Sequence, residues 1–420
     1  MSILHIEDIR ISYKGHDLSQ YGLFPLVAWY LIDVIKLPEY FEQVTVNKTR
    51  NPNKKRKPKK HLFSDSHMCM GLLSLPILGI ERISKINERL SNETQLANLL
   101  GLPRFFEQST AHGYLNRVTK WHVAQLDRIN HQLLLRHGAC SQQPLVVVDI
   151  DAQTHTLESR KRQKAVVGFN KKKPGKPCYQ WNVAFVCHEA VSQQLMAGNS
   201  HCRGTVLSLV DDVAEKLDNP LMIVRLDGGY LSAEVLNALV ERQLQVCMAC
   251  RYDWVQAQGI RLKKKKWEQI DEITRLYDVG KTPVISTCSH QFRVVLVEKQ
   301  QTPFPGSKSR KKFHRYGILE SLAFNLDSKG VYDFYHGRQT IEQFFKESTG
   351  PFGAGKMPSQ KFRANEAYLQ LVTIAENCML WFKKNFYLSS GNTIQWEPYA
   401  TNSFIMERVS SSLEQYAVYA

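Results

Sequence analysis

The amino-acid sequence predicts an α/β protein: a mixed β-sheet flanked by helices, preceded by a helical region and interrupted by a β-rich insertion. Three observations support this fold class. Apolar residues recur at helical spacing over residues 1–140, short β-branched runs alternate with helical stretches over 141–251, and helical periodicity returns over 331–390 after a stretch of short alternating runs. Strands that alternate with helices are typical of a sheet covered by helices.

The helical region 1–140 is interrupted by a strongly basic segment, residues 48–60. It carries eight positive charges and no acid, and its two prolines and lack of an apolar face favour a loop rather than a helix. A solvated surface run is one interpretation. We favour a loop that contacts the phosphates of a nucleic acid, because clustered cations bind a duplex backbone. The cations at its centre are Lys54, Lys55, Arg56 and Lys57.

The predicted sheet begins after Pro144. Residues 145–151 form a β-branched run, residues 179–187 and 192–197 form a predicted hairpin, and residues 220–226 and 244–250 are further strands, each preceded by a helical stretch. The order is therefore three strands, helix, strand, helix, strand. This is the order of an RNase H-like sheet, in which the hairpin is antiparallel and the crossovers are parallel.

The remainder of the chain completes the predicted organisation. Residues 252–330 contain short alternating runs and basic loops, which predict the β-rich insertion. Residues 331–390 form the second part of the core, with apolar residues at steps of three and four. Residues 391–420 are left as a C-terminal tail.

The charge balance indicates a polyanionic partner. Lys and Arg number 55 against 39 Asp and Glu, so the formal net charge is +16 and the sequence pI is about 9.3. Nucleic acid fits this charge best. A membrane role is disfavoured, because no apolar run approaches the roughly 20 residues that a spanning helix needs. The N-terminal residues lack the pattern of a secretory signal, so we expect a cytoplasmic protein.

The nine cysteines are scattered, and we expect reduced, buried thiols rather than a disulfide framework. Cys247 and Cys250 have the spacing of a zinc knuckle. They lack a second ligand pair and continue a strand-like run, so a zinc site is not predicted.

Four carboxylates are placed where this architecture would bring them together. Asp149 and Asp151 lie two residues apart on one strand and share a face, Asp227 ends another strand, and Glu342 lies on the helix after the insertion. Carboxylate oxygens are the ligands that Mg²⁺ prefers, and Mn²⁺ can replace it. Two such ions could activate the attacking oxygen and stabilise the leaving oxygen during displacement at phosphorus.

The segment Tyr335-His-Gly-Arg338-Gln-Thr-Ile-Glu342 resembles the signature Tyr-x2-Arg-x3-Glu-x6-Lys of bacterial insertion-sequence transposases with a DDE catalytic triad. The resemblance extends over about residues 95–385. Further segments match in family order: Asp151-Ala-Gln-Thr, the basic loop Gly168-Phe-Asn-Lys-Lys-Lys-Pro-Gly-Lys, Gly198-Asn199, Leu226-Asp227-Gly-Gly-Tyr230 and Ala364-Asn-Glu-Ala367.

Two features depart from the family pattern or leave it open. The family lysine would fall on Thr349, and Lys346 could replace it, because positions four and seven after Glu342 lie on nearly the same helix face. The first catalytic Asp is either Asp149 or Asp151. We choose Asp151, which precedes a small residue as in the family, and keep Asp149 as a possible additional carboxylate.

The resemblance implies roles for these residues. Asp151, Asp227 and Glu342 would be the catalytic, metal-binding residues, and Arg338 and Tyr335 would contact the DNA backbone. Members of the family cut terminal inverted repeats and join the freed 3′-hydroxyl to target DNA. The DNA-binding residues would include the helical region 1–140 and the basic loop with Lys171, Lys172 and Lys173.

Synapsis of two transposon ends implies at least a homodimer on double-stranded DNA, and the resemblance implies a bacterial, nucleoid-associated location. Two rival hypotheses stay open. A catalytically inert, transposase-derived DNA-binding protein would account for Thr349, and a nuclease of the same fold would share the carboxylates.

Overall fold

The computed structural model describes residues 21, 24–47, 62–201, 203–257, 259, 262, 266–301, 312–350 and 352–390. The basic segment 48–60, with Lys54, Lys55, Arg56 and Lys57, and the tail 391–420 lie outside the described residues.

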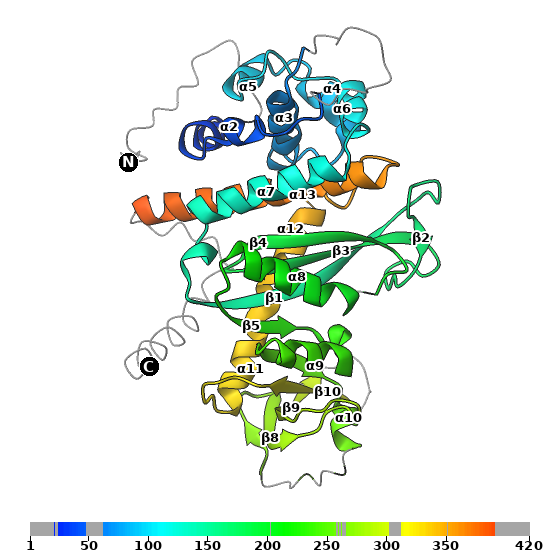
Figure 1. The fold of residues 1–420 in the computed structure, drawn as a ribbon, viewed down its shortest axis with the longest axis vertical. Coiled ribbons are helices and arrows are strands. Elements are labelled where there is room, and N and C mark those ends of the chain that lie inside the picture. The colour runs from blue at the N-terminus through cyan, green and yellow to red at the C-terminus, as the bar shows by residue number, and fades with distance from the viewer. Residues whose placement is uncertain are drawn as a thin grey trace.

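A group of helices forms one end of the molecule (Figure 1). Its long helix α7 begins at a capping box, in which the Thr119 backbone N–H is bonded to His122 Nδ1 over 3.0 Å. The helices of this group are α1 (Phe24–Trp29), the π-helical turn η2 (Tyr30–Val34), α2 (Leu37–Phe41), α3 (Asp65–Ile77), η3 (Ile83–Lys85), α4 (Ile86–Leu90), α5 (Thr94–Leu99), α6 (Gln108–Leu115), α7 (Lys120–His137) and the short η4 (Cys140–Gln142).

The described strands lie in one mixed sheet of ten strands, in the order β2-β3-β1-β5-β6-β10-β9-β8-β7, and β4 also pairs with β3. The core strands are β1 (Leu145–Thr156), β2 (Val166–Val167), β3 (Pro177–Val186), β4 (Glu189–Ala197), β5 (Leu221–Leu226) and β6 (Gln245–Cys250). The hairpin β1-β3-β4 is antiparallel, and β1, β5 and β6 are parallel. The parallel crossovers contain α8 (Arg203–Lys216) and α9 (Ala233–Glu241). The predicted α/β fold class with an RNase H-like strand order is therefore confirmed.

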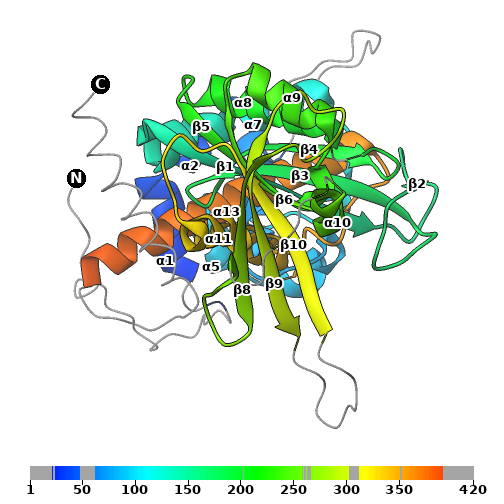
Figure 2. The same ribbon diagram turned by 90° about the horizontal axis from the view of Figure 1, so that it is seen from below.

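The strands that follow the core continue the same sheet. β10 (Lys312–Glu320) pairs antiparallel with β6, and β9 (Phe292–Gln301), β8 (Thr274–Thr282) and β7 (Glu268–Gln269) follow outward. The short helix α10 (Tyr252–Gln256) connects β6 to this extension. Figure 2 shows β8, β9 and β10 side by side beyond the core. The edge of β6 is thus covered by pairing rather than exposed.

The catalytic segment of the prediction folds as three consecutive helical pieces, α11 (Ser328–His336), η7 (Gly337–Gln339) and α12 (Thr340–Thr349). α12 packs on the hairpin through aromatic side chains: the rings of Phe344 and Phe185 lie 4.5 Å apart and those of Phe345 and Trp181 5.5 Å apart. These contacts fix the helix that carries Glu342 against β3, next to β1.

The last helix, α13 (Phe362–Ser390), lies with α7 between the helical end and the sheet (Figure 1). Its middle is buried. Its buried side chains include Ala367, Leu371, Ile374 and Cys378, which recur at helical spacing. No helix among the described residues is both long enough and apolar enough to span a membrane.

Candidate active site

The two aspartates of β1 lie in different environments. Asp149 is buried, and both of its carboxylate oxygens accept hydrogen bonds from Arg225: Oδ1 from Nε over 2.7 Å and Oδ2 from Nη2 over 2.6 Å. The two residues are neighbours in the parallel register of β1 and β5. This bidentate pair uses the acceptor capacity that a metal ligand would need.

Arg225 also joins the sheet to α11. Its Nη1 donates to the Phe334 carbonyl oxygen near the end of α11, and its guanidinium lies 5.0 Å from the centre of the Phe334 ring. A Cβ added at Gly337 would lie 2.6 Å from Arg225 Nη1, so a larger residue there would require the guanidinium or the backbone to move. The Asp149–Arg225 pair therefore fixes the junction from which Arg338 follows.

Asp151 is the more open of the two. Its Oδ2 accepts a hydrogen bond from Arg338 Nη2 over 3.1 Å, and its Oδ1 accepts one from the Ala152 backbone N–H over 2.8 Å. Burial raises the pKa of this carboxyl, Arg338 and the Ala152 N–H lower it, and the negative charges of Asp227 and Glu342 raise it further, for a net increase. The negative charge of Asp151 is therefore only partly balanced by the positive charge and the hydrogen-bond donor beside it.

Asp227 caps the short helix η5 (Gly228–Tyr230) at the end of β5, where its side chain accepts a hydrogen bond from the Gly229 backbone N–H. Its charge raises the pKa of both Asp151 and Tyr335. For Tyr335, burial is the largest cause, Arg338 acts against it, and the pKa rises to about 12. Charge effects of this kind act over short distances. They therefore indicate that the side chains of Asp227, Asp151, Tyr335 and Arg338 lie near one another.

Glu342 lies in the first turn of α12 and is exposed, while Ile341 and Phe345 on the same helix are buried in the core. Its charge acts on Asp151. Lys346, one turn further on, is also exposed. The Thr349 hydroxyl donates to the Phe345 carbonyl oxygen over 2.6 Å, so it is engaged within its own helix.

Arg338 is buried and is paired with Asp151. Its predicted contact with a DNA phosphate stays a prediction. Burial acts to lower its pKa, but Asp151, Tyr335 and Asp227 outweigh this and raise it, so the guanidinium stays charged. Its Nε has no partner among the described groups. Arg338 therefore has one buried N–H without an acceptor among the described groups.

The donor set fits hard divalent cations, because it consists of carboxylate oxygens and the charge on Asp151 is poorly compensated. No group of three metal-binding side chains among the described residues is already close enough to hold an ion. Binding a cation would relieve the repulsion among Asp151, Asp227 and Glu342, and it requires these side chains to draw together.

The predicted DNA-binding lysines Lys171, Lys172 and Lys173 are all exposed, in the loop before β3. Lys173 Nζ lies 3.4 Å from Glu158. Sequence reasoning missed Arg225. An arginine inside an otherwise apolar strand, Leu-Met-Ile-Val-Arg-Leu, signals a buried carboxylate partner and could have indicated it.

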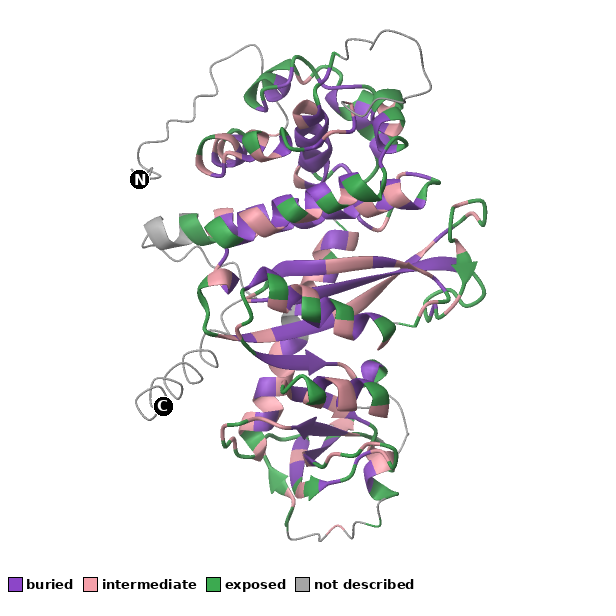
Figure 3. Cartoon of the chain, in the orientation of Figure 1, coloured by how far each residue is buried: buried purple, intermediate pink, exposed green. Residues whose placement is uncertain are grey.

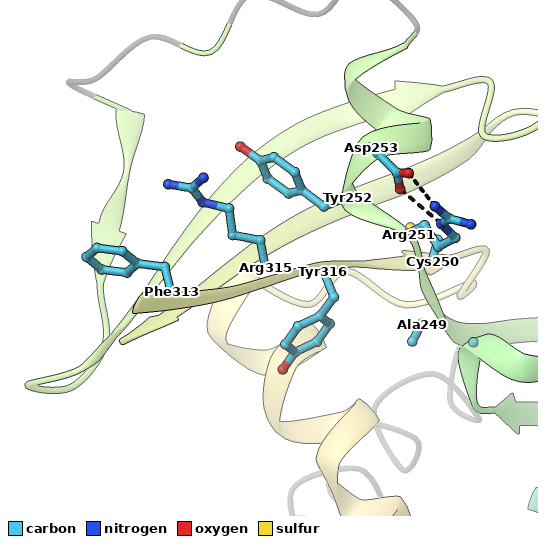
Figure 4. Close-up of a pocket in the computed structure, with 9 residues that line it drawn as sticks. Ala249, Cys250, Arg251, Tyr252, Asp253, Phe313, Arg315 and Tyr316 are labelled. Carbon is cyan, nitrogen blue, oxygen red and sulfur yellow. Dashed lines mark hydrogen bonds and ion pairs between the residues drawn. The ribbon is translucent and has the colours of Figure 1, made fainter. Parts of the chain in front are cut away.

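A cavity of about 550 Å³ opens beside Gly228, the residue after Asp227, and Figure 4 shows the side chains around it. Arg251 and Asp253 are paired at its edge over 2.5 Å. Its other lining residues include Tyr252, Phe313, Arg315 and Tyr316, and Arg315 is paired with Glu298.

Comparison with known proteins gives a family match and weaker structural matches. A family profile described as "Transposase DDE domain group 1" matches residues 7–398. No curated protein matches the sequence. One similar solved structure is the piggyBac transposase synaptic complex with hairpin DNA, with 11% identity, a TM-score of 0.47, and coverage of 94% of this chain and 82% of that chain. Another is the Mos1 transposase paired-end complex, with 12% identity, a TM-score of 0.18, and coverage of 47% and 62%.

Proposed function

This chain belongs to the DDE transposase family, group 1, and we propose that Asp151, Asp227 and Glu342 are the catalytic carboxylates with which it cuts and joins DNA. The observation that carries this assignment is the placement of the three residues. Asp151 lies on β1, Asp227 follows the neighbouring parallel strand β5, and Arg338, which is bonded to Asp151, stands four residues before Glu342. These residues come from β1, the end of β5 and α12. Asp149 is assigned instead to a structural pair with Arg225.

The proposed reaction is displacement at phosphorus. Water attacks the phosphorus of the scissile bond at the transposon end, and the bond to the 3′-oxygen breaks. The freed 3′-hydroxyl later attacks a phosphorus of target DNA, where the bond to the target strand's own 3′-oxygen breaks and that oxygen leaves as a 3′-hydroxyl. Mg²⁺, with Mn²⁺ as a substitute, would be held by the three carboxylates and would activate the attacking oxygen and stabilise the leaving one. Arg338 would pair with a phosphate of the DNA backbone, and Tyr335 would contact the same backbone.

The proposed DNA contacts surround these carboxylates. Lys346 extends the exposed face of α12 beyond Glu342, and Lys171, Lys172 and Lys173 lie on the exposed loop before β3. The basic segment with Lys54, Lys55, Arg56 and Lys57 would add phosphate contacts. Two ends must be held together for joining, so we propose at least a homodimer on DNA that carries terminal inverted repeats.

The decisive experiment measures cleavage and binding separately. The substrates are duplexes of the DNA that flanks the coding sequence, with Mg²⁺ present for cleavage and omitted for binding. Asp151→Asn, Asp227→Asn and Glu342→Gln should each lower cleavage by at least about a thousandfold, comparable to losses of key catalytic groups, while binding changes by only a few fold.

Glu347→Gln is the matched control, because it neutralises a carboxylate on the same helix, where Glu347 accepts a hydrogen bond from Gln343 over 2.6 Å. Its cleavage should equal that of the parent. Equal loss in Glu342→Gln and Glu347→Gln would contradict the assignment of Glu342.

The same assay separates the two rival functions. An inert DNA-binding protein would bind the flanking duplexes tightly and leave them uncut. A nuclease of the same fold would cut scrambled duplexes as readily as flanking ones. A transposase should cut the flanking duplexes preferentially and join them to a second DNA.

A further inference from the structure

Residues 157–177 connect β1 to β3, and we call them the β1–β3 arm. They carry an exposed phenylalanine, Phe169, that has no role in the chemistry described above. The arm projects from the molecule at the end of β1, where Figure 1 labels β2, and Figure 3 shows it as largely exposed. Phe169 on this arm is 69% exposed, which is unusual for an aromatic side chain in an ordered loop.

The loop around Phe169 is held in place on both sides. A Cβ added at Gly168 would lie 1.7 Å from the Gly198 carbonyl oxygen, so the two backbones are in direct contact. The Phe169 carbonyl oxygen accepts a hydrogen bond from Gln180 Nε2 over 2.8 Å. Asn170 is buried, donates to Thr156 Oγ1 over 2.9 Å, and accepts from the Lys173 N–H over 3.0 Å. The exposure of Phe169 is therefore built into the fold.

The positive charge of the arm indicates a negatively charged partner. Residues 157–177 contain eight Lys and Arg and a single acid, Glu158, which is already paired with Lys173. Lys171 Nζ lies 5.3 Å from the centre of the Phe169 ring. An aromatic ring among cations suits a nucleic acid, whose phosphates take the charge and whose bases stack on the ring.

The arm is also within reach of DNA at the carboxylates. It continues the strand that carries Asp151, and Thr156 lies five residues further along, a distance of about 17 Å at the usual rise per residue. A duplex rises about 3.4 Å per base pair, so this distance corresponds to about five base pairs.

We propose that Phe169 is a wedge that inserts between, or stacks on, bases of double-stranded DNA near the cleavage position, while Lys171 and its neighbours hold the phosphates on either side. This rests on the proposed function, because it requires DNA at Asp151. It assigns to the arm a contact with bases in addition to the phosphate contacts of its lysines.

The test separates the apolar contact from the charged one by the salt dependence of binding, measured without divalent ions so that cleavage does not interfere. The probe is the flanking duplex. Phe169→Ala should weaken binding about 10- to 100-fold, as loss of a base-stacking aromatic does, and leave the slope of log affinity against log salt unchanged. The triple replacement of Lys171, Lys172 and Lys173 by Ala should reduce that slope by up to about 0.9 for each phosphate that the lysines no longer neutralise.

Leu221→Ala is the matched control. Leu221 is 70% exposed, and it begins β5, at the opposite end of the strand from Asp227. This variant should bind like the parent. Because Phe169 and Leu221 are both exposed, neither replacement should prevent folding.

A second measurement locates the wedge. Duplexes with 2-aminopurine at successive positions should show increased fluorescence at one or two adjacent positions when the parent protein binds, because the wedge unstacks the base. Phe169→Ala at saturating concentration should abolish the increase, and Leu221→Ala should retain it.

Unchanged affinity together with an unchanged fluorescence profile in Phe169→Ala would overturn the wedge. Failure of the parent itself to bind the duplex would instead overturn the proposed function. The wedge test uses binding alone, so it can be read even where a variant such as Glu342→Gln has lost cleavage.

Discussion

Asp149 and Asp151 lie two residues apart on one strand and are both paired with arginine, yet the two pairs differ in how completely they are closed. The Asp149–Arg225 pair is bidentate, with side chains 10% and 11% exposed. Asp151 makes one bond to Arg338, and these side chains are 19% and 10% exposed. A closed pair contributes to structure, whereas an open one leaves capacity for a ligand. We therefore assign different roles to the two aspartates, although they are of the same residue type and lie on the same face.

The largest effect on stability should follow from breaking the closed pair. Arg225→Met leaves Asp149 buried without its partner and removes the donor to the Phe334 carbonyl oxygen. The free energy of unfolding, measured with urea, should fall by about 3–5 kcal/mol. Arg338→Met should cost clearly less stability, because the carboxylate of Asp151 is more exposed and keeps its bond from the Ala152 N–H. Equal losses would remove the distinction between the two pairs.

Replacing both members of each pair sharpens the distinction further. Asp149→Leu with Arg225→Met should recover more than half of the stability lost in Arg225→Met, because an apolar pair avoids an uncompensated buried charge. Cleavage should fall by no more than about tenfold, because the loss of the Arg225 bond to the Phe334 carbonyl oxygen acts only indirectly and neither residue is proposed to touch DNA. Asp151→Leu with Arg338→Met should abolish cleavage whatever its stability. Activity in the second double variant would assign the chemistry elsewhere.

The fold class was accessible from sequence because it depends on local patterns. The β-branched runs of β1, β5 and β6 and the helices between them predict the strand order directly, and membership of the DDE transposases is confirmed along with it. The continuation of the sheet through β10 was not predicted, because the pairing of β10 with β6 joins segments separated by an insertion. Alternation predicts that a strand exists but not its neighbour.

The carboxylate cluster was predicted for the same local reasons, and its residue roles remain predictions. Period two places Asp149 and Asp151 on one face, but it cannot say which is neutralised. That depends on the register of β1 against β5, which places Arg225 beside Asp149. The bond from Arg338 to Asp151 depends on the turn η7, whose backbone reaches the sheet through Gly337.

Gly337→Ala tests the junction that the closed pair supports. Its Cβ would lie 2.6 Å from Arg225 Nη1, so either the guanidinium or the backbone must move. We expect a loss of about 1–3 kcal/mol in the free energy of unfolding, as for other overpacked sites, together with weaker cleavage because Arg338 follows directly. Gly113→Ala on α6, where no atom lies within 4 Å of the added Cβ, is the control and should be neutral or slightly stabilising. A neutral Gly337→Ala would show that the junction is adaptable.

The smallest effect concerns the pH dependence of stability, and it isolates the open carboxylate. Burial, followed by the charges of Asp227 and Glu342, raises the pKa of Asp151 above its ordinary value even though Arg338 opposes the shift. A raised folded-state pKa means that its stabilising contribution is present below the unfolded pKa of about 4 and is lost as pH rises through the folded value. Asp151→Asn should remove that loss, so its unfolding free energy should fall less than the parent's between acidic and neutral pH.

Mg²⁺ should then stabilise the parent at neutral pH, because a cation favours the anionic carboxylate, and should have a smaller effect on Asp151→Asn. Identical pH profiles of parent and variant, with identical responses to Mg²⁺, would mean that the charge of Asp151 is balanced by its arginine as fully as the charge of Asp149.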